Sequence, residues 1–191
     1  MIRHLPNLIS LARLVLVPVV LRAIWFHEYD WALAWCAVAG LSDGLDGFLA
    51  RRLRATSRAG AYLDPLADKL LLSGTYLTLG LGHVIPWWLT AVVFGRDLLM
   101  LLFLAGAILF TRIREFKPTI WGKISTAVQI FTALAILLNR SSHFGQFPPF
   151  FENSAIALTV IATSWSAVHY AWVGVRMLRG ERLGRPGPQV H

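Results

Sequence analysis

Residues Asp43 to Lys69 read DGLDGFLARRLRATSRAGAYLDPLADK and stand out from the rest of the chain by their charge. This stretch places four aspartates, Asp43, Asp46, Asp64 and Asp68, within 26 residues, while the segments on either side are almost uniformly apolar. An ionised aspartate at the depth of a bilayer costs about 2.5–3.5 kcal/mol on insertion scales, so it is retained where it is paired, hydrated or bound to a cation. The four carboxylates therefore predict a divalent metal site within a membrane protein.

The spacing of the aspartates favours two helices. Asp43 and Asp46 are three residues apart, and Asp64 and Asp68 are four apart, so each pair would share one face of a helix. Carboxylate oxygens favour magnesium, manganese or calcium over zinc, and the stretch contains no His or Cys. The alternative is that the aspartates only cap helices or pair with the arginines between them, which are Arg51, Arg52, Arg54 and Arg58.

The composition indicates an all-α integral membrane protein. Hydrophobic residues make up 56% of the 191 residues, charged residues make up 15%, and the mean hydropathy is +0.58. Apolar windows long enough to cross about 30 Å of hydrocarbon predict six transmembrane helices. They lie near 7–26, 31–51, 61–82, 86–111, 118–139 and 152–178. The third carries charged residues in its first half, so we expect a bundle with a polar, metal-containing cleft.

The basic residues predict the orientation in the membrane. Twelve of the 18 Lys and Arg fall at the termini and in the second and fourth connections, and Arg140 alone falls in a loop of the opposite side. The positive-inside rule then puts both termini, and the open side of the cleft, in the cytoplasm. We expect one multi-pass membrane domain over 1–179, a flexible basic cytoplasmic tail over 180–191, and location in a bacterial inner membrane.

The net charge of +8 does not indicate a nucleic-acid partner, because the sequence has no soluble basic face and no recognisable nucleic-acid module. Attraction to anionic lipid headgroups accounts for it. The single Cys36 excludes an intramolecular disulfide and is expected as a small core residue. The apolar run near the N-terminus is interrupted by Arg13 and Pro18 and is expected as the first helix.

Nine positions of the opening stretch resemble a family signature. They are Asp43, Gly44, Asp46, Gly47, Ala50, Arg51, Gly60, Asp64 and Asp68. The chain is identified from them as resembling the CDP-alcohol phosphatidyltransferases. Residues 6–13, the Gly95-Arg96-Asp97 triplet and the segment 117–129 are similar to the branch that contains phosphatidylglycerophosphate synthases and cardiolipin synthases.

The resemblance implies transfer of a phosphatidyl group from CDP-diacylglycerol to an alcohol, with release of CMP and with Mg²⁺ or Mn²⁺ as cofactor. It makes Asp43, Asp46, Asp64 and Asp68 the metal ligands, and Asp68 the residue that takes the proton from the attacking hydroxyl. The residues that it implies for binding CDP-diacylglycerol are Asn7, Gly47, Ala50, Arg51 and Gly60. The two glycines carry no Cβ and would let the nucleotide approach the backbone.

Three intramembrane charges, Arg96, Asp97 and Lys123, are expected to face the interior, with Arg96 and Lys123 binding the acceptor alcohol. The alternative is an ion pair of Asp97 that serves packing alone. Phosphatidylglycerophosphate synthases usually carry a further Arg where this chain has Leu104, which favours phosphatidylglycerol over glycerol-3-phosphate as acceptor and hence cardiolipin as product. A non-enzymatic metal transporter is the alternative of a different class, and a homodimer is an open alternative to a monomer.

Overall fold

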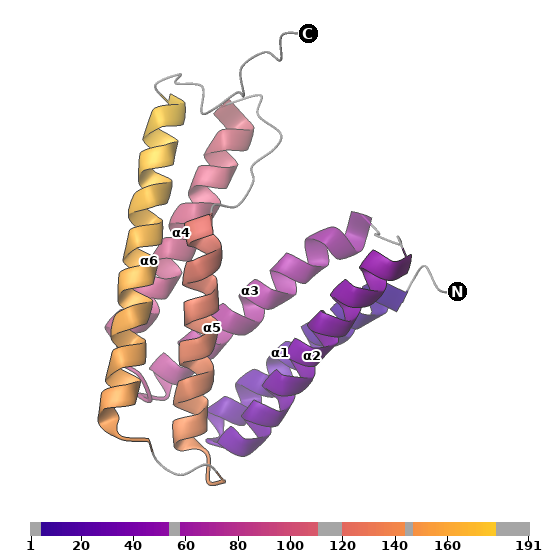
Figure 1. Ribbon diagram of the computed structural model, residues 1–191, viewed down its shortest axis with the longest axis vertical. Coiled ribbons are helices and arrows are strands. Elements are labelled where there is room, and N and C mark those ends of the chain that lie inside the picture. The colour runs from indigo at the N-terminus through magenta and orange to yellow at the C-terminus, as the bar shows by residue number, and fades with distance from the viewer. Residues whose placement is uncertain (1–4, 54–57, 111–119, 144–146, 179–191) are drawn as a thin grey trace.

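The computed structural model describes residues 5–53, 58–110, 120–143 and 147–178, which form six helices and no strand (Figure 1). The helices are α1 (Leu5–Trp25), α2 (Tyr29–Leu53), α3 (Arg58–Leu81), α4 (Trp87–Phe110), α5 (Ile120–Arg140) and α6 (Pro149–Leu178). Side chains are described for 12–42, 67–102, 120–143, 147–172 and 175. The prediction of an all-helical chain with six helices is confirmed. The predicted tail, 180–191, lies outside the described residues, and the division at residue 179 stays a prediction.

The turns at one end of the molecule have local causes in the sequence. The turn between α1 and α2 contains His27 with φ 60°, and the turn between α3 and α4 contains His83 with φ 56°, so each chain reversal uses a residue in the left-handed region. Pro149 begins α6, where a residue without an amide hydrogen leaves no helical hydrogen bond unmade. These turns give the short connections that place successive helices antiparallel.

Two groups of three helices make up the molecule (Figure 1). In one group α1 packs against α2 and α3, and in the other α6 packs against α4 and α5. Contacts of α3 with α4 and α5, and of α2 with α5, join the groups. The groups meet near the turns just described and diverge toward the end where α1, α3 and α5 begin.

A buried apolar cluster closes the end where the groups meet. It draws on the last turns of α1, α3 and α5 and the first turns of α2 and α4. Its largest members include Ile24, Tyr76, Leu79, Leu89 and Ile136, none of which is more than 2% exposed. Because this core lies at one end, the diverging end is free to hold polar groups.

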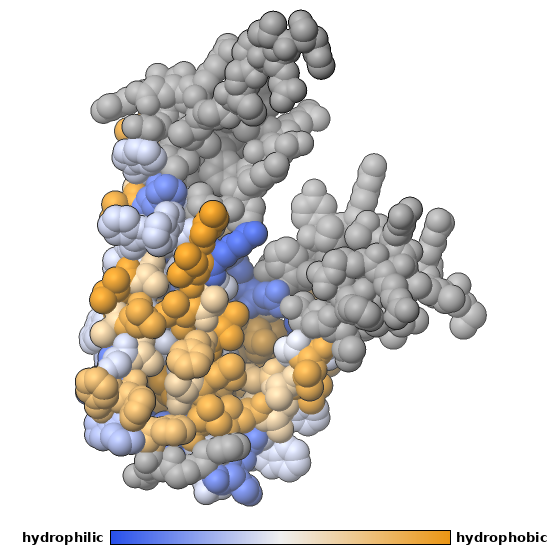
Figure 2. All heavy atoms as spheres, viewed as in Figure 1, coloured by the Kyte–Doolittle hydropathy of each residue, from blue (hydrophilic) through white to orange (hydrophobic). Residues whose placement is uncertain are grey.

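The molecule is apolar outside and polar in part of its interior, as a protein in lipid would be. Large apolar side chains are exposed on every helix, with Leu41 at 69%, Phe131 at 65% and Ile161 at 66% (Figure 2). A soluble monomer rarely exposes so much contiguous apolar surface. Between α5 and α6, by contrast, buried hydroxyl and amide groups are hydrogen-bonded: Thr159 donates to Thr132 at 2.8 Å, and the Gln129 amide donates to Thr163 at 3.0 Å.

Among the described residues one helix, Ile120–Arg140, is both long and apolar enough to cross a membrane by length and composition. The remaining five predicted spans are found as helices of suitable length, from 21 to 30 residues. That all six cross a bilayer stays a prediction.

Candidate active site

The helices carry the aspartate pairs at the predicted spacing. Asp43 and Asp46 lie within α2, and Asp64 and Asp68 lie within α3, so each pair is about one helical turn apart. Of the four, only the Asp68 side chain is among the described residues. The side chains of the other predicted donor-site and metal residues lie outside them, namely Asn7, Asp43, Asp46, Gly47, Ala50, Arg51, Gly60 and Asp64. Within the part of the chain that is described, no three His, Cys, Asp or Glu side chains are placed so that they could hold a metal ion together, and the metal ligands stay a prediction.

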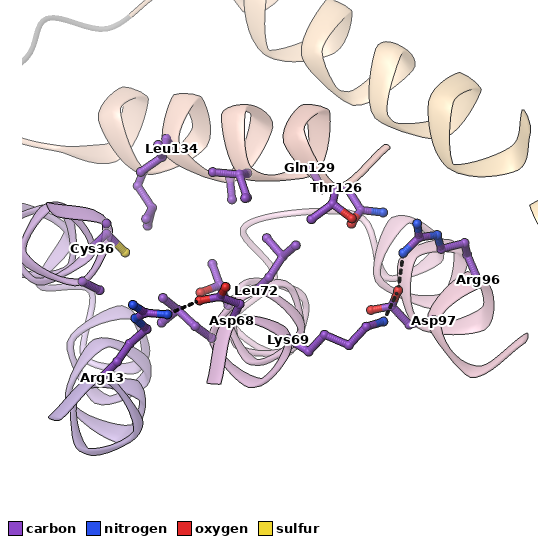
Figure 3. Close-up of a pocket in the computed structure, with 17 residues that line it drawn as sticks. Arg13, Cys36, Asp68, Lys69, Leu72, Arg96, Asp97, Thr126, Gln129 and Leu134 are labelled. Atoms are coloured by element: carbon purple, nitrogen blue, oxygen red, sulfur yellow. Dashed lines mark hydrogen bonds and ion pairs between the residues drawn. The ribbon is translucent and has the colours of Figure 1, made fainter. Parts of the chain in front are cut away.

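Asp68 is held by a buried arginine of another helix. Arg13 of α1 donates from Nη1 to Asp68 Oδ1 at 2.9 Å, which ties α1 to α3 (Figure 3). The Arg13 side chain is 1% exposed, whereas the Asp68 side chain is 55% exposed. A charge-assisted hydrogen bond fixes where a carboxylate lies. Asp68 is therefore oriented on one side and accessible on the other, as a group that must reach a substrate needs to be.

Asp68 borders a cavity of about 410 Å³ between the two helix groups. Residues of α1 to α5 line it, and most of the lining is apolar, including Leu72, Leu134 and Leu137. The charged lining residues are Arg13, Asp68, Lys69, Arg96 and Asp97. Hydrophilic side chains lie at the floor of the recess between the groups in Figure 2. The described lining thus combines three cations and two carboxylates with walls that suit acyl chains.

The Asp97 carboxylate joins two cations on one side of this cavity. Its Oδ1 lies 2.6 Å from Arg96 Nη1 and 2.9 Å from Lys69 Nζ, and its Oδ2 accepts a hydrogen bond from Ser73 at 3.3 Å. Lys69 and Ser73 come from α3. Arg96 and Asp97 come from α4, and Figure 3 shows them with Lys69. We call Lys69, Arg96 and Asp97 the Asp97 cluster. Its formal charge is +1.

Besides its ion pair with Asp97, Arg96 is held by contacts with α5 and α6. Its Nη2 donates to the Gly122 carbonyl at 3.1 Å and lies 3.5 Å from Ser166 Oγ, and its guanidinium carbon lies 6.0 Å from the Tyr170 ring centre. A Cβ at Gly122 would lie 2.5 Å from the Tyr170 hydroxyl, so the close approach of α5 to α6 requires glycine there. With 4% of its surface exposed, Arg96 of α4 joins α5 and α6 and also lines the cavity.

One buried acceptor of the lining has no donor among the described residues. Gln129 is fully buried on α5, and its Nε2 donates to Thr163, whereas its Oε1 accepts no hydrogen bond from that part of the chain. A buried acceptor without a donor costs about 1–3 kcal/mol. In Figure 3, Gln129 and Thr126 lie across the cavity from Lys69 and Asp97.

Of the three charged residues predicted to face the interior, two are buried and one is exposed. Arg96 and Asp97 are buried and line the cavity, which confirms their interior position, and Asp97 does form the ion pair that was the alternative. The expectation that Lys123 faces the interior is wrong: its side chain is exposed. Lys123 is one residue away from the buried stripe of α5 and thus about 100° around the helix from Gly122.

Sequence reasoning missed three contributors. The pairing of Arg13 with Asp68 and of Lys69 with Asp97 joins residues 55 and 28 positions apart, which no local pattern indicates. Gln129 was detectable. It belongs to a stripe of small and polar residues at three- and four-residue steps on an otherwise apolar helix, and that stripe is buried.

Comparison with known proteins gives the family of the chain. The sequence profile described as CDP-alcohol phosphatidyltransferase matches residues 3–171. The chain belongs to the CDP-alcohol phosphatidyltransferase family. The family is membrane-bound, in keeping with the apolar outer surface.

Relatives in this family carry two different names. A cardiolipin synthase (CMP-forming) of Rattus norvegicus is 32% identical over 200 residues, covering 93% of this chain and 64% of the relative. A probable phosphatidylglycerophosphate synthase of Mycobacterium tuberculosis is 32% identical over 188 residues, covering 95% and 86%. A cardiolipin synthase (CMP-forming) of Streptomyces coelicolor is 33% identical over 180 residues, covering 90% and 79%. The chain thus spans 64% of the length of the rat and human cardiolipin synthases that it matches, which is less than two thirds.

Proposed function

We propose that this chain is a phosphotransferase of phospholipid biosynthesis, which transfers a phosphatidyl group from CDP-diacylglycerol to a glycerol-type alcohol and releases CMP. The observation that carries the proposal is Asp68, the last carboxylate of the family signature, held by Arg13 at the edge of a charged cavity with apolar walls. A transporter or scaffold gives no reason for a half-exposed, oriented carboxylate beside such a cavity. A transferase needs one to accept a proton.

The chemical step assigns Asp68 a defined role. The hydroxyl oxygen of the acceptor bonds to the phosphatidyl phosphorus, and the bond from that phosphorus to the bridging oxygen breaks, so that CMP leaves with the electron pair. The hydroxyl proton passes to an Asp68 carboxylate oxygen. Arg13 keeps that carboxylate in place, and the apolar lining limits competing attack by water.

The residues of α2 and α3 fit a divalent cation by their chemistry. Asp43, Asp46, Asp64 and Asp68 supply only hard oxygen donors, at helical spacings that the backbones of α2 and α3 provide. Mg²⁺ or Mn²⁺ held by them would neutralise charge on the diphosphate oxygens as CMP departs. Gly47, Ala50, Arg51 and Gly60, with Asn7, are proposed to bind CDP-diacylglycerol.

We favour phosphatidylglycerol as acceptor, with glycerol-3-phosphate as the second candidate. The described lining carries one positive charge in excess, which matches a phosphodiester monoanion better than a phosphomonoester dianion. The segment 98–109 adds no basic residue. The M. tuberculosis relative named as a probable phosphatidylglycerophosphate synthase keeps the second candidate in view.

The proposed placement is a six-span bundle with both termini in the cytoplasm. In support, α1, α3 and α5 begin, and α2, α4 and α6 end, toward the same end of the molecule (Figure 1). The cavity then opens on the side where nucleotide-activated lipid is made. A homodimer stays a prediction.

The test is a product assay. Purified protein in mixed micelles with Mg²⁺ receives radiolabelled CDP-diacylglycerol and, separately, phosphatidylglycerol, glycerol-3-phosphate, serine or inositol phosphate. We expect cardiolipin as the dominant labelled product. Phosphatidylglycerophosphate as the dominant product would reject the acceptor and keep the enzyme class, whereas no labelled lipid with any alcohol would reject the class.

A further inference from the structure

We propose that Lys69, positioned by Asp97, is the cation that binds the phosphate of the acceptor alcohol. This inference rests on the proposed function and names the part of the site that selects the acceptor. The phosphate-binding cation is then a lysine of α3, adjacent in sequence to the proposed proton acceptor Asp68, and not an additional arginine of α4. Asp97 is then a positioning residue, because it acts through Lys69.

The position of Lys69 follows from helix geometry. Successive residues of a helix point about 100° apart. Asp68 accordingly turns toward α1 and meets Arg13, while Lys69 turns toward α4 and meets Asp97 (Figure 3). Both side chains line the same cavity. A molecule that contacts both would have one group beside the carboxylate and another beside the ammonium.

The charges of the Asp97 cluster suit a single negative charge. Asp97 is shared by two cations, and Arg96 is already engaged by the Gly122 carbonyl. Lys69 has three N–H donors, and Asp97 is its one polar partner among the described residues. Lys69 therefore has unused donors in a cluster whose charge is +1. A bound phosphodiester would bring that charge to zero.

The same phosphate chemistry could come from either substrate, and the location favours the acceptor. The signature residues proposed for the donor, from Gly47 to Gly60, precede Asp68 at the end of α2 and the start of α3. Lys69 lies on the α4 side of Asp68, whereas Arg13 lies on its α1 side. A proton acceptor should lie between donor and acceptor alcohol, and a donor held by the signature residues with an acceptor held by Lys69 would have that order.

The experiment compares Lys69→Met with Lys69→Arg and with Arg22→Met. Arg22 is an exposed cation near the end of α1 and controls for loss of one positive charge. Removing Lys69 leaves the Arg96–Asp97 pair neutral, so the fold should persist. KM for phosphatidylglycerol and KM for CDP-diacylglycerol are measured separately in micelles of fixed composition, together with the melting temperature.

We expect Lys69→Met to raise KM for phosphatidylglycerol about 10- to 100-fold, with KM for CDP-diacylglycerol changed less than about threefold. Lys69→Arg should restore most of the affinity, and Arg22→Met should behave as wild type. The inference would be overturned if Lys69→Met raised KM for CDP-diacylglycerol only, or left KM for phosphatidylglycerol unchanged. It would also be overturned if Lys123→Met raised KM for phosphatidylglycerol and Lys69→Met did not. Wild-type protein that releases no CMP with any alcohol would instead reject the proposed function.

Discussion

Replacing Asp97 with alanine should destabilise the protein far more than replacing either of its cationic partners singly. Asp97 is 9% exposed and has ion pairs with Arg96 at 2.6 Å and Lys69 at 2.9 Å. Without it, two like charges remain side by side where little water reaches. The Arg96 side chain is 3% exposed, so it cannot be hydrated without local unfolding.

The expected cost is about 3 kcal/mol. Removing one partner of a fully buried ion pair costs about 3–5 kcal/mol. We take the lower bound because Arg96 keeps its bond to the Gly122 carbonyl. For a chain of this length each kcal/mol lowers the melting temperature by about 2–4 °C, which predicts a decrease of about 6–12 °C.

Thermal unfolding in detergent, followed by circular dichroism, measures this decrease. Lys69→Met is the matched control and should shift the melting temperature by less than about 3 °C, because the remaining pair is neutral. The double variant Arg96→Met with Asp97→Ala should be more stable than Asp97→Ala alone, since it removes one of the two uncompensated cations and the repulsion between them. An Asp97→Ala protein that melts within 2 °C of wild type would refute the reasoning.

Three further predictions concern other parts of the molecule. Excess EDTA should abolish CMP release and Mg²⁺ should restore it, with Asp43→Ala inactive in both conditions; full turnover in EDTA would contradict the metal site. Gly122→Ala should lower the melting temperature by several degrees, because its Cβ would displace the buried Tyr170 hydroxyl. A melting temperature equal to that of wild type would show that α5 and α6 can move apart without loss of stability. Hydrogen bonds from Ser141 and Ser142, with the nearby His143, lower the pKa of Asp30, which precedes the 31–51 span. The stability that this carboxylate contributes should therefore be complete above about pH 5 and should decline as the pH falls below its unfolded pKa of about 3.9. Melting temperatures of Asp30→Asn measured against pH should lack that part of the decline.

The helices were predictable from the sequence because their causes are local. Each apolar window is bounded by charged residues, glycine or proline, and the structure places every helix within about three residues of its predicted bounds. The third helix was the hardest case. Its first half is crowded by Asp64, Asp68 and Lys69, yet it continues to Leu81 because Asp68 and Lys69 each find a partner of opposite charge on a neighbouring helix.

The partners themselves were not predictable, because they depend on which helices become neighbours. Asp68 could be singled out from its spacing, but its bond to Arg13 required the contact between α1 and α3. Asp97 and Arg96 were expected inside the bundle from the cost of exposing charge to lipid. The same argument failed for Lys123, since a lysine near the end of a helix can extend its ammonium toward the membrane surface.

We propose above that Asp68 accepts the proton of the acceptor alcohol in a phosphatidyl transfer. The most direct test measures CMP release from CDP-diacylglycerol with phosphatidylglycerol, in wild type and in Asp68→Asn, beside equilibrium binding of CDP-diacylglycerol to both proteins. We predict steady CMP release by wild type, a decrease of about 100-fold or more in Asp68→Asn, and similar binding of CDP-diacylglycerol to both. CMP release by Asp68→Asn at the wild-type rate would contradict the claim, and loss of CDP-diacylglycerol binding would assign Asp68 to holding the donor.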